Sequence, residues 1–483
     1  MKAHEVLSSI AGRSAKRRYN RNGNPRVPST AAIADEYLSD ASGFHGSASQ
    51  LFHPTSVDEV REIVKAAVDS KTPLTLSGGR TGLTGGCVPQ GGWVLSLDRM
   101  NKLSIEPGVA HAGAGVLLHE IHREAAATGQ FFGPDPTETW ASVGGAINCN
   151  ASGSRSFRYG SMRRHILSLE VVLMDGRILQ VQRGDKVDFP VTPIPRPATT
   201  KHSAGYYLGP DLDWIDLIAA SEGTLGIVTR ADLQLLPAPA GLLSGLVFFP
   251  SDGLALAAVR AWRPVAGLRM LEYVDKPSLE FIRVKYPDIP VNASAALLIE
   301  QECGASEDAA DQWLDRLEKH GELATSWFGT TDRDRERFRV FRHALPEEVH
   351  RIVRGRGLQT VGSDYAVPIE MNERMLAFYR EQCEQHFHGN YVIFGHIGDA
   401  HVHVNLMPLD EAHAQSGREM MVTFAKKAVE LGGTIGAEHG LGKRKAHLLP
   451  LLYSAEQIEA MRAVKRRFDP EWLLGRGTLF AAA

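Results

Sequence analysis

The sequence predicts an α+β protein of two or more domains, and two observations support this prediction. The chain has 483 residues, well above the roughly 100–200 residues that usually form one domain. The sequence pattern also changes after the proline-containing segment LLPAPAGLL (235–243). From about residue 241, alternating apolar strands mix with charged helices such as 306–324, which is typical of an antiparallel sheet that carries helices.

The first half contains helices and strands joined by turns rich in small residues. A helix is predicted after Ser56, because four valines between 57 and 68 recur at helical spacing and form one apolar stripe. The further predicted elements are a strand at 73–76, a strand within 91–103, a helix within 115–130, a loop over 133–160, and a hairpin at 165–181 that turns at Asp175–Gly176.

The predicted organisation has four parts: an N-terminal arm (1–45), a first domain (46–240), a second domain (241–435) and a C-terminal segment (436–483). An amphipathic helix is predicted near the end of the last part. The first 34 residues hold seven Lys or Arg and a single acid, Glu5. We interpret them as a solvated arm, with an organelle transit peptide as the alternative.

Composition and charge exclude several classes of function. The net charge is 53 − 56 = −3, so bulk electrostatics favour neither a nucleic acid nor an anionic membrane as partner. The sequence has no apolar run of the ~18–20 residues that span a bilayer. Four cysteines lie far apart, at 87, 149, 303 and 383, which does not suit a disulfide framework. We therefore expect a cytoplasmic protein and leave open a peripheral contact with a membrane.

The stretch SGGRTGLTGG (77–86) holds five glycines, and it indicates an anion-binding turn. Successive backbone N–H groups in such a turn form a nest for a phosphate. The stretch lacks the lysine of a P-loop. It also runs toward another strand and not into a helix, unlike a dinucleotide-binding fingerprint. The phosphate therefore belongs to another kind of cofactor.

Two further stretches narrow the choice of cofactor. GPDPTETWASVGGAINCNASGSRSFRYGSMRRHILSLEVVLMDG (133–176) and ASEGTLGIVT (220–229) are rich in small residues and follow the glycine stretch in order. Together the three stretches resemble the FAD-binding domain of the vanillyl-alcohol oxidase/p-cresol methylhydroxylase (PCMH) superfamily, over about residues 47–237. The resemblance implies a two-part PCMH-type FAD-binding domain.

The resemblance also implies the residues that bind FAD. Those expected at the pyrophosphate are Ser77, Gly78, Gly79, Arg80, Thr81 and Gly82. Those expected along the flavin channel are Asp135, Gly144, Gly145, Ser152, Gly153 and Tyr159, with Ser142, Asn148 and Gly160 as further contacts. Those expected along the rest of the cofactor are Glu222, Gly223, Gly226 and Ile227. Some members attach flavin to a histidine, but the first loop has none between His53 and His111, so we expect non-covalent FAD.

Histidines and acids gather in two stretches of the second half. FGHIGDAHVHVNL (394–406) has three histidines within eight residues, and GGTIGAEHGLGKRKA (432–446) holds the pair Glu438–His439. His396 and His403 would lie about 10.5 Å apart on a helix and about 23 Å apart on a straight strand. They can bind one ion only if the chain turns between them, at Gly395, Gly398 and Asp399. Two imidazoles and one carboxylate indicate a catalytic divalent-metal site; the alternative is a hydrogen-bonded histidine hairpin.

These segments resemble the C-terminal domain of the FAD-linked 2-hydroxy-acid dehydrogenases, such as D-lactate dehydrogenase, the glycolate oxidase FAD subunit and D-2-hydroxyglutarate dehydrogenase. The resemblance implies an α+β cap domain with an antiparallel sheet and a C-terminal helix that returns to the FAD domain. It implies His396, His403 and Glu438 as ligands of Zn or Mn, and His439 as the active-site base. It implies Asn405 and Arg342 as substrate contacts, since a guanidinium binds a carboxylate with two hydrogen bonds. Arg339 is the alternative to Arg342.

The implied activity is FAD-dependent oxidation of a 2-hydroxy carboxylate to the 2-oxo acid by hydride transfer to flavin N5. The implied electron acceptor is a quinone, an electron-transfer flavoprotein or a cytochrome, and a homodimer is left open. The alternatives are alkyl-dihydroxyacetone-phosphate synthase-like chemistry, sugar or lactone oxidation, and a non-catalytic FAD subunit of a complex. This sequence departs from the family pattern at Gly362, at His401, which adds an imidazole that could compete as ligand, and at Gly475–Arg476. The reaction class is therefore better defined than the substrate.

Overall fold

The computed structural model describes residues 33–304, 308–320 and 325–480. The basic arm predicted from the first 34 residues lies almost entirely outside the described residues. The part of the arm that is described is ordered against the first domain: the 3₁₀ helix η1 spans Asp35–Tyr37, and the Ala41 N–H donates to the Arg80 carbonyl at 3.2 Å. The described structure therefore begins before Gly46.

The first domain contains two sheets. A parallel three-stranded sheet has the order β1-β3-β2, and a second sheet has the order β4-β5-β9-β7-β8 with β6 paired to β9. All pairs of the second sheet are antiparallel. The strands are β1 (Gln50–Phe52), β2 (Leu74–Ser77), β3 (Trp93–Ser96), β4 (Leu103–Glu106), β5 (Val109–Gly113), β6 (Gln130–Phe132), β7 (Ile166–Val172), β8 (Ile178–Gln182) and β9 (Ile227–Pro237).

Short helices join these strands. They are α2 (Val57–Asp69), α3 (Leu118–Ala127), α4 (Val143–Cys149), α5 (Ser156–Tyr159), η2 (Met162–His165) and α6 (Trp214–Ile218). The predicted helix after Ser56 is confirmed as α2, which buries Val60 and Val64 together with Ile63 and Ala67. The predicted hairpin is confirmed as β7–β8.

The prediction of a loop over 133–160 was wrong, because α4 and α5 lie there. The helix α4 has two glycines in its first turn, Gly144 and Gly145, and glycine disfavours a helix in isolation. A capping hydrogen bond and burial in the core stabilise it. The Ser142 hydroxyl accepts the Gly145 N–H at its start, and Val143, Ala146 and Ile147 are buried in the core.

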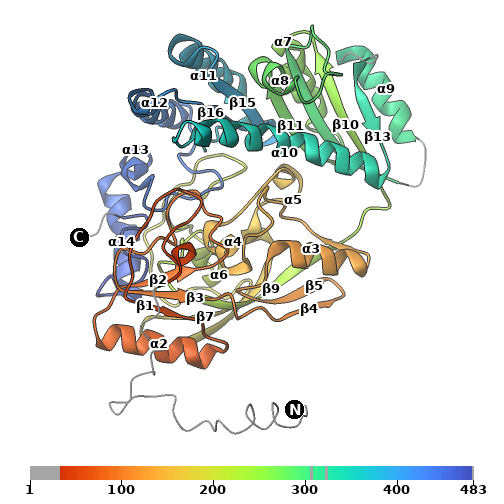
Figure 1. The fold of residues 1–483 in the computed structure, drawn as a ribbon. Coiled ribbons are helices and arrows are strands. Elements are labelled where there is room, and N and C mark those ends of the chain that lie inside the picture. The colour runs from red at the N-terminus through yellow and green to blue at the C-terminus, as the bar shows by residue number, and fades with distance from the viewer. Residues whose placement is uncertain (1–32, 305–307, 321–324, 481–483) are drawn as a thin grey trace, which may run out of the picture.

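The second domain is built on one antiparallel sheet of seven strands, in the order β13-β10-β12-β11-β15-β16-β14, which confirms the predicted cap. Figure 1 shows this sheet and its helices above the first domain. Its strands are β10 (Gly241–Phe249), β11 (Leu268–Asp275), β12 (Ala295–Cys303), β13 (Trp327–Gly329), β14 (Val361–Gly362), β15 (Tyr391–His396) and β16 (His401–Leu406). Its helices are α7 (Asp252–Trp262), α8 (Lys276–Ile282), α9 (Asp308–His320), α10 (Asp332–Gly355), η4 (Ile369–Met371), α11 (Asn372–Phe387), η5 (Ile397–Asp399) and α12 (Glu411–Glu430).

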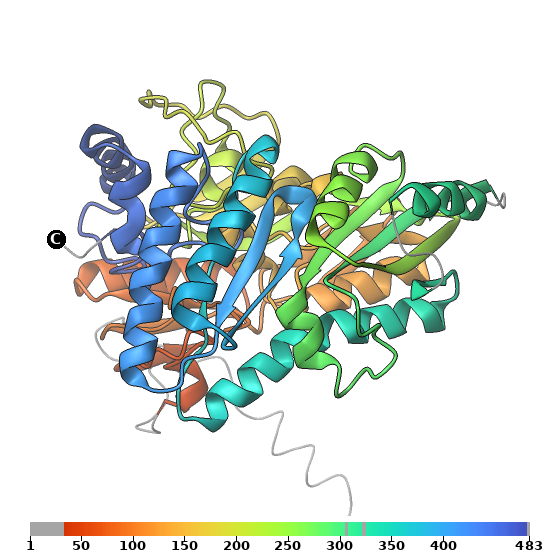
Figure 2. The same ribbon diagram turned by 90° about the horizontal axis from the view of Figure 1, so that it is seen from above.

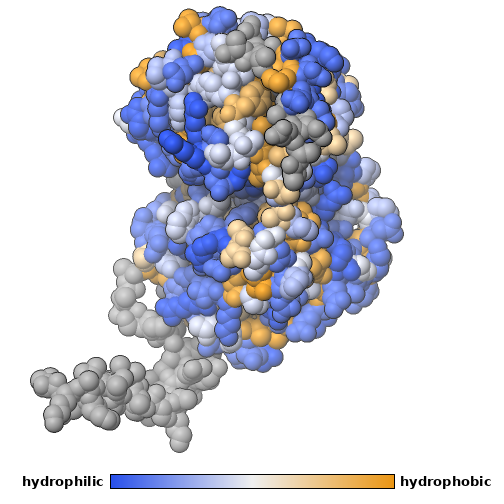
Figure 3. Space-filling view, turned by 90° about the vertical axis from the view of Figure 1, so that its right-hand side faces the viewer, coloured by the Kyte–Doolittle hydropathy of each residue, from blue (hydrophilic) through white to orange (hydrophobic). Residues whose placement is uncertain are grey.

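Viewed from above, α11 and α12 lie side by side next to the β15–β16 hairpin (Figure 2). Figure 3 shows the molecule from the side, where its surface narrows between the upper and lower parts. Hydrophobic residues are scattered over both parts of this face. Within the described residues, every helix is too short or too polar to cross a membrane.

The end of the chain returns to the first domain, as predicted. The last elements are η6 (Ala446–Leu448), α13 (Leu449–Leu452) and α14 (Ala455–Phe468), and they lie beside the first domain in Figure 1. After α14 the chain pairs with β2: the Leu74 N–H donates to Leu473 O at 2.8 Å, and the Gly475 N–H donates to Leu74 O at 2.9 Å. The C-terminal segment therefore spans both domains and can place its residues at their boundary.

Candidate active site

The hairpin of β15 and β16 brings the histidines together. Its strands pair Phe394 with His403 and His396 with His401, and η5 makes the turn that the seven-residue spacing requires. Ala400 closes the turn with a φ of 50°, in the left-handed region. The strands thus hold three imidazoles at one end of the cap sheet.

Glu438 reaches this hairpin from the C-terminal segment. Its Oε1 lies 3.3 Å from His396 Nε2 and 3.2 Å from His403 Nε2. One ligand atom from each of His396, His401, His403 and Glu438 lies within 4.8 Å of the others. With ligand bonds of about 2.0–2.1 Å, a tetrahedral zinc site places its ligand atoms roughly 3.3–3.4 Å apart, which the two distances from Glu438 to the histidines match.

Hydrogen bonds behind the imidazoles fix which nitrogen faces Glu438. His396 Nδ1 lies 2.7 Å from Glu272 Oε1, and His403 Nδ1 lies 3.1 Å from the Ser363 carbonyl oxygen. A metal-binding histidine commonly donates its other N–H to a carboxylate or carbonyl in this way. Both Nε2 atoms therefore face Glu438, and each would offer its lone pair to a metal once deprotonated.

His401 is fully buried, and neither of its ring nitrogens makes a hydrogen bond. Its Nε2 lies 3.3 Å from Asp364 Oδ1. Burial, followed by the neighbouring His403, lowers the pKa of His401 to about 3, so its imidazole is neutral. A neutral, buried imidazole next to two others is what a metal ligand needs, and the extra histidine noted in the sequence lies inside the cluster.

Lys201 completes the surroundings of Glu438 and was missed from the sequence. Its Nζ is fully buried and lies 2.9 Å from Glu438 Oε2 and 3.6 Å from Asp399 Oδ2. The Ser152 hydroxyl donates to the same Oε2 at 3.0 Å. Although burial alone would raise the pKa of Glu438, Lys201 and His396 hold it well below its usual range. Glu438 is therefore a carboxylate at neutral pH.

The side chain of His439 lies next to the side chain of Glu438 and does not point away from it. Its Nε2 is 3.5 Å from Glu438 Oε1, and its ring stacks on His403 with centroids 5.5 Å apart. Asp364 holds this backbone, because its two oxygens accept the N–H groups of Glu438 and His439 at 3.1 Å each. His439 is 28% exposed, and burial lowers its pKa. A neutral imidazole therefore faces the accessible side of the cluster.

Arg342 reaches the cluster from α10, whereas Arg339 does not. Arg342 Nε donates to Glu272 Oε2 at 3.0 Å, and its NH1 donates to the Thr137 hydroxyl at 3.1 Å. Arg339 pairs with Glu336 on the surface and is 58% exposed. Of the two arginines that the sequence left open, the structure brings Arg342 to the site.

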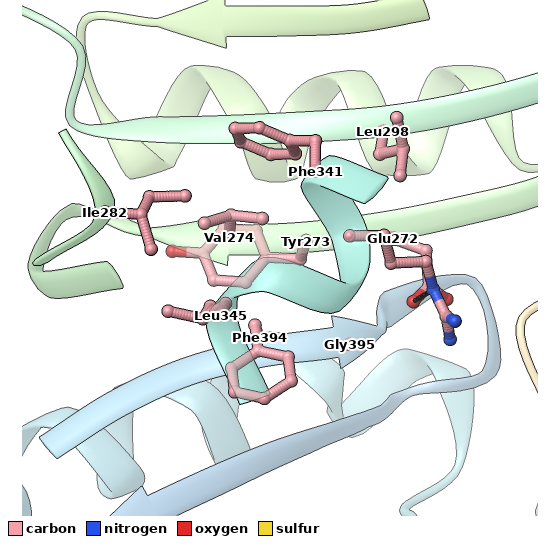
Figure 4. A pocket seen from close by; sticks show the side chains of 10 residues that line it. Glu272, Tyr273, Val274, Ile282, Leu298, Phe341, Leu345, Phe394 and Gly395 are labelled. Atoms are coloured by element: carbon pink, nitrogen blue, oxygen red, sulfur yellow. Dashed lines mark hydrogen bonds and ion pairs between the residues drawn. The ribbon is translucent and has the colours of Figure 1, made fainter. Parts of the chain in front are cut away.

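A small cavity of about 20 Å³ lies behind Glu272, between α10 and the strands β11, β12 and β15. Figure 4 shows Glu272 at one end of it and Ile282 at the other, with apolar side chains between. The volume suffices for about one water molecule. It is a packing gap of the cap core and offers no room for a substrate.

Asn405 is on β16, and its side chain faces the strand β14. A Cβ on Gly362 would lie 3.1 Å from Asn405 Oδ1. The glycine that departs from the family pattern thus leaves space beside this amide.

The three stretches expected to bind FAD meet through their backbones. A Cβ on Gly79 would lie 2.4 Å from Trp140 O, one on Gly78 would lie 2.3 Å from Ser142 Oγ, and one on Gly153 would lie 1.9 Å from Asp135 O. The third stretch joins α4, since the Glu222 N–H donates to Asn148 O at 2.8 Å. The glycines are therefore required by the close packing of loop on loop as well as by any phosphate.

The segment that carries His439 lies on two of these stretches. The N–H groups of Lys443 and Arg444 donate to Thr84 O at 2.9 and 3.1 Å. The half-buried carboxyl of Glu222 accepts the N–H groups of Leu441 and Gly442 at 2.8 and 2.7 Å. Burial raises the pKa of Glu222 to about 7. The expected cofactor loops and the segment that follows the histidine cluster are thus in direct contact.

Some residues expected at FAD have other surroundings. Ile227 lies in the apolar cluster with Val60 and Val64, and the Tyr159 hydroxyl donates to Glu302 of β12. Asp135 forms an ion pair with Arg155 at 3.2 Å. Arg80 has a φ of 60°, and its NH1 donates to Gly78 O at 3.0 Å, so its side chain stabilises the loop.

Comparison with known proteins decides the family. A family of FAD-binding domains matches residues 48–182, and the C-terminal domain of FAD-linked oxidases matches residues 239–479. A D-lactate dehydrogenase of Archaeoglobus fulgidus is 32% identical over 439 residues, which are 88% of this chain and 89% of that protein.

The chain belongs to the FAD-linked oxidases.

Other FAD-linked oxidases are similar over nearly the whole chain. The glycolate oxidase subunit GlcD of Bacillus subtilis is 30% identical, covering 89% of this chain and 88% of its own. A D-2-hydroxyglutarate dehydrogenase of Xanthomonas citri is 29% identical, covering 88% of each. A solved structure of alkyldihydroxyacetonephosphate synthase superposes with a TM-score of 0.66 at 16% identity, covering 89% of this chain and 76% of that one. The last likeness establishes the fold.

The three converging stretches are the expected FAD site, and a glycine pair there tests this expectation. We expect Gly79→Ala to lower both bound flavin and the free energy of unfolding, the latter by about 1–3 kcal/mol, because its Cβ would collide with a backbone carbonyl. Gly86 is the matched control in the same loop, since a Cβ there meets nothing within 4 Å. Flavin absorbance per protein and denaturant unfolding would measure the effect. Equal loss in both variants would mean that the loop does not depend on close packing at Gly79.

Proposed function

We propose that this FAD-linked oxidase oxidises a 2-hydroxy carboxylate of the D-lactate or D-2-hydroxyglutarate type to the 2-oxo acid. The observation that carries the proposal is one cluster in which His396, His403 and Glu438 lie beside His439, on a segment that packs on the expected FAD loops. Relatives named for D-lactate and D-2-hydroxyglutarate oxidation align over about nine-tenths of the chain, which supports the same substrate class here.

The donor set fits a divalent metal such as Zn or Mn. His396, His403 and Glu438 would hold it, and His401 offers a fourth ligand atom from a buried ring beside Asp364. When bound, the metal supplies a Lewis acid for the substrate hydroxyl and the flavin supplies the hydride acceptor. If His401 is a ligand, the metal keeps fewer positions for substrate than in a site with three protein ligands.

The chain's own residues divide the remaining work. His439 Nε2 takes the proton of the substrate 2-hydroxyl, because it is a neutral imidazole on the accessible side of the cluster. Arg342 binds the substrate carboxylate with the part of its guanidinium that Glu272 does not occupy. Asn405, beside the space left by Gly362, contacts the substrate. FAD is held without a covalent bond, and the electrons leave to a quinone, an electron-transfer flavoprotein or a cytochrome.

Anaerobic reduction of the bound flavin tests the proposal. The enzyme is treated with EDTA, Zn²⁺ or Mn²⁺ is returned, and flavin bleaching is followed with a panel of D- and L-2-hydroxy acids. We expect bleaching by at least one hydroxy acid that depends on the returned metal. A flavin that no 2-hydroxy acid reduces, or that is reduced equally well without metal, would contradict the proposal. Acid denaturation of the same sample should release FAD.

The two neighbouring arginines of α10 give a matched test of carboxylate binding. We expect Arg342→Lys to raise KM by about tenfold or more, because lysine keeps the charge beside Glu272 but loses the planar fork. Arg339→Lys should leave KM unchanged, since that residue pairs with Glu336 on the surface. Steady-state kinetics with the substrate from the panel measure both. If Arg339→Lys raises KM and Arg342→Lys does not, the carboxylate contact belongs to Arg339.

A further inference from the structure

A second cavity, of about 600 Å³, opens on the first domain. Its walls come from several parts of the first domain; the lining residues are Asn150, Gly160, Ser161, Arg163, Arg164, Arg183, Arg196, Pro197, Thr199, Thr200, His202 and Asp216. Small-molecule sites usually measure about 300–1,000 Å³, so the volume suits a metabolite. Of the residues expected at FAD, only Gly160 lies in these walls, and none of the residues in the histidine cluster does.

The cavity carries an excess of positive charge. Four arginines line it, at 163, 164, 183 and 196, against one carboxylate, Asp216. Asp216 Oδ1 lies 2.9 Å from Arg183 and 3.5 Å from Arg163. Arg183 has a second acidic partner in Asp213, at 2.9 Å. Within the described residues, Arg164 and Arg196 form no ion pair with any acid.

Two of the arginines pack on the same aromatic ring. The guanidinium carbons of Arg163 and Arg196 lie 4.9 and 4.7 Å from the centroid of the Tyr207 ring. Arg163 is fixed by hydrogen bonds to the carbonyls of Asp216 and Ala219, while its buried Nε has no partner. Burial, and next the charge of Arg196, lowers the pKa of Arg163 to about 10. An anion bound in the cavity that both arginines line would offset this repulsion.

The walls also supply neutral hydrogen-bond donors. Ser161, Thr199 and Thr200 line the cavity together with the arginines. Guanidinium forks and hydroxyl groups are the side chains that bind phosphate oxygens. A monocarboxylate substrate would balance a single guanidinium, whereas the dianion of a phosphate matches the two arginines that have no acidic partner.

We propose that this cavity, defined by Arg163, Arg164, Arg183 and Arg196, binds the phosphate group of a small molecule at a site separate from the flavin and the histidine cluster. The same chemistry would accept inorganic phosphate. One phosphate group does not fill the cavity of about 600 Å³, so there is room for the rest of a phosphate ester. The proposal does not depend on which hydroxy acid the enzyme oxidises.

Calorimetric titration of the FAD-loaded enzyme tests this site with inorganic phosphate, glucose 6-phosphate and glucose. We expect both phosphates to bind and glucose not to bind. Tighter binding of the ester would assign the site to a phosphorylated metabolite, and equal binding would assign it to the free anion. We expect Arg196→Gln and Arg164→Gln each to weaken phosphate binding by about tenfold or more. The control is Arg467→Gln, because Arg467 also lies over an aromatic ring, that of Phe189, at 4.5 Å, but outside the cavity.

Three results would overturn the proposal. The first is the absence of phosphate binding at millimolar concentration. The second is a dissociation constant that Arg196→Gln and Arg164→Gln leave as it is in the wild type. The third is loss of flavin in both variants while the far-ultraviolet circular dichroism stays unchanged, which would mean that the cavity belongs to the cofactor.

Discussion

Replacing His439 with glutamine should lower turnover by roughly 10²–10⁴-fold, the usual contribution of a general base, while flavin stays bound. Glutamine keeps a polar side chain of similar length but does not accept a proton at neutral pH. The backbone N–H of residue 439 would still bond to Asp364, so the local structure should persist. Single-turnover flavin reduction under anaerobic conditions measures the chemical step directly.

His447 is the matched control for this variant. It lies on the same C-terminal segment but is exposed, so His447→Gln should reduce flavin at the wild-type rate. A His439→Gln enzyme that reduced flavin within about threefold of the wild-type rate, against the 10²-fold minimum expected of a base, would remove His439 from this role.

The second large effect is expected at Glu438. In metal-free protein, Glu438→Gln should lower the free energy of unfolding by about 3–5 kcal/mol, because removing one partner leaves the charge of Lys201 buried and poorly compensated. We expect a value near the lower end of that range, since Asp399 stays 3.6 Å from Lys201 Nζ. The same variant should also lose bound Zn or Mn, measured by elemental analysis.

The double variant Glu438→Gln/Lys201→Met separates the two effects. Removing both charges should return at least half of the lost stability, whereas metal binding should stay lost because a ligand is still missing. Urea unfolding of EDTA-treated samples gives the stability of all three proteins. A double variant no more stable than Glu438→Gln would mean that Lys201 and Glu438 are not coupled through their charges.

The local elements of this protein could be predicted where one pattern dominated. The valine stripe of α2, the Asp175–Gly176 hairpin and the change to an antiparallel sheet near residue 241 depend on short-range periodicity. The helix α4 was missed because its glycine-rich start has low propensity, and it is stabilised by a cap and by burial against the core.

The candidate site was predicted in part. His396, His401, His403 and Glu438 stood out because such residues are dense in two short stretches. Lys201 lies alone in a stretch of small residues, and the pattern there carries no signal for a buried cation. Glu272 had a weak signal that could have been used: it is a charged residue within β11, a strand whose eight residues are all buried. A carboxylate in such a strand needs a partner, and its partners are His396 and Arg342.

By itself the sequence determined the cofactor family and the residue types of the site, because glycine-rich turns and clustered histidines are local features. Only the tertiary structure decided that the glycine loop and the His439 segment lie side by side. The glycine loop and His439 are more than 350 residues apart, yet the Thr84 hydroxyl lies 3.4 Å from the His439 carbonyl oxygen. Contacts across such a separation are set by how the C-terminal segment packs between two domains. They depend on shape and burial over the whole chain, which a local pattern does not contain.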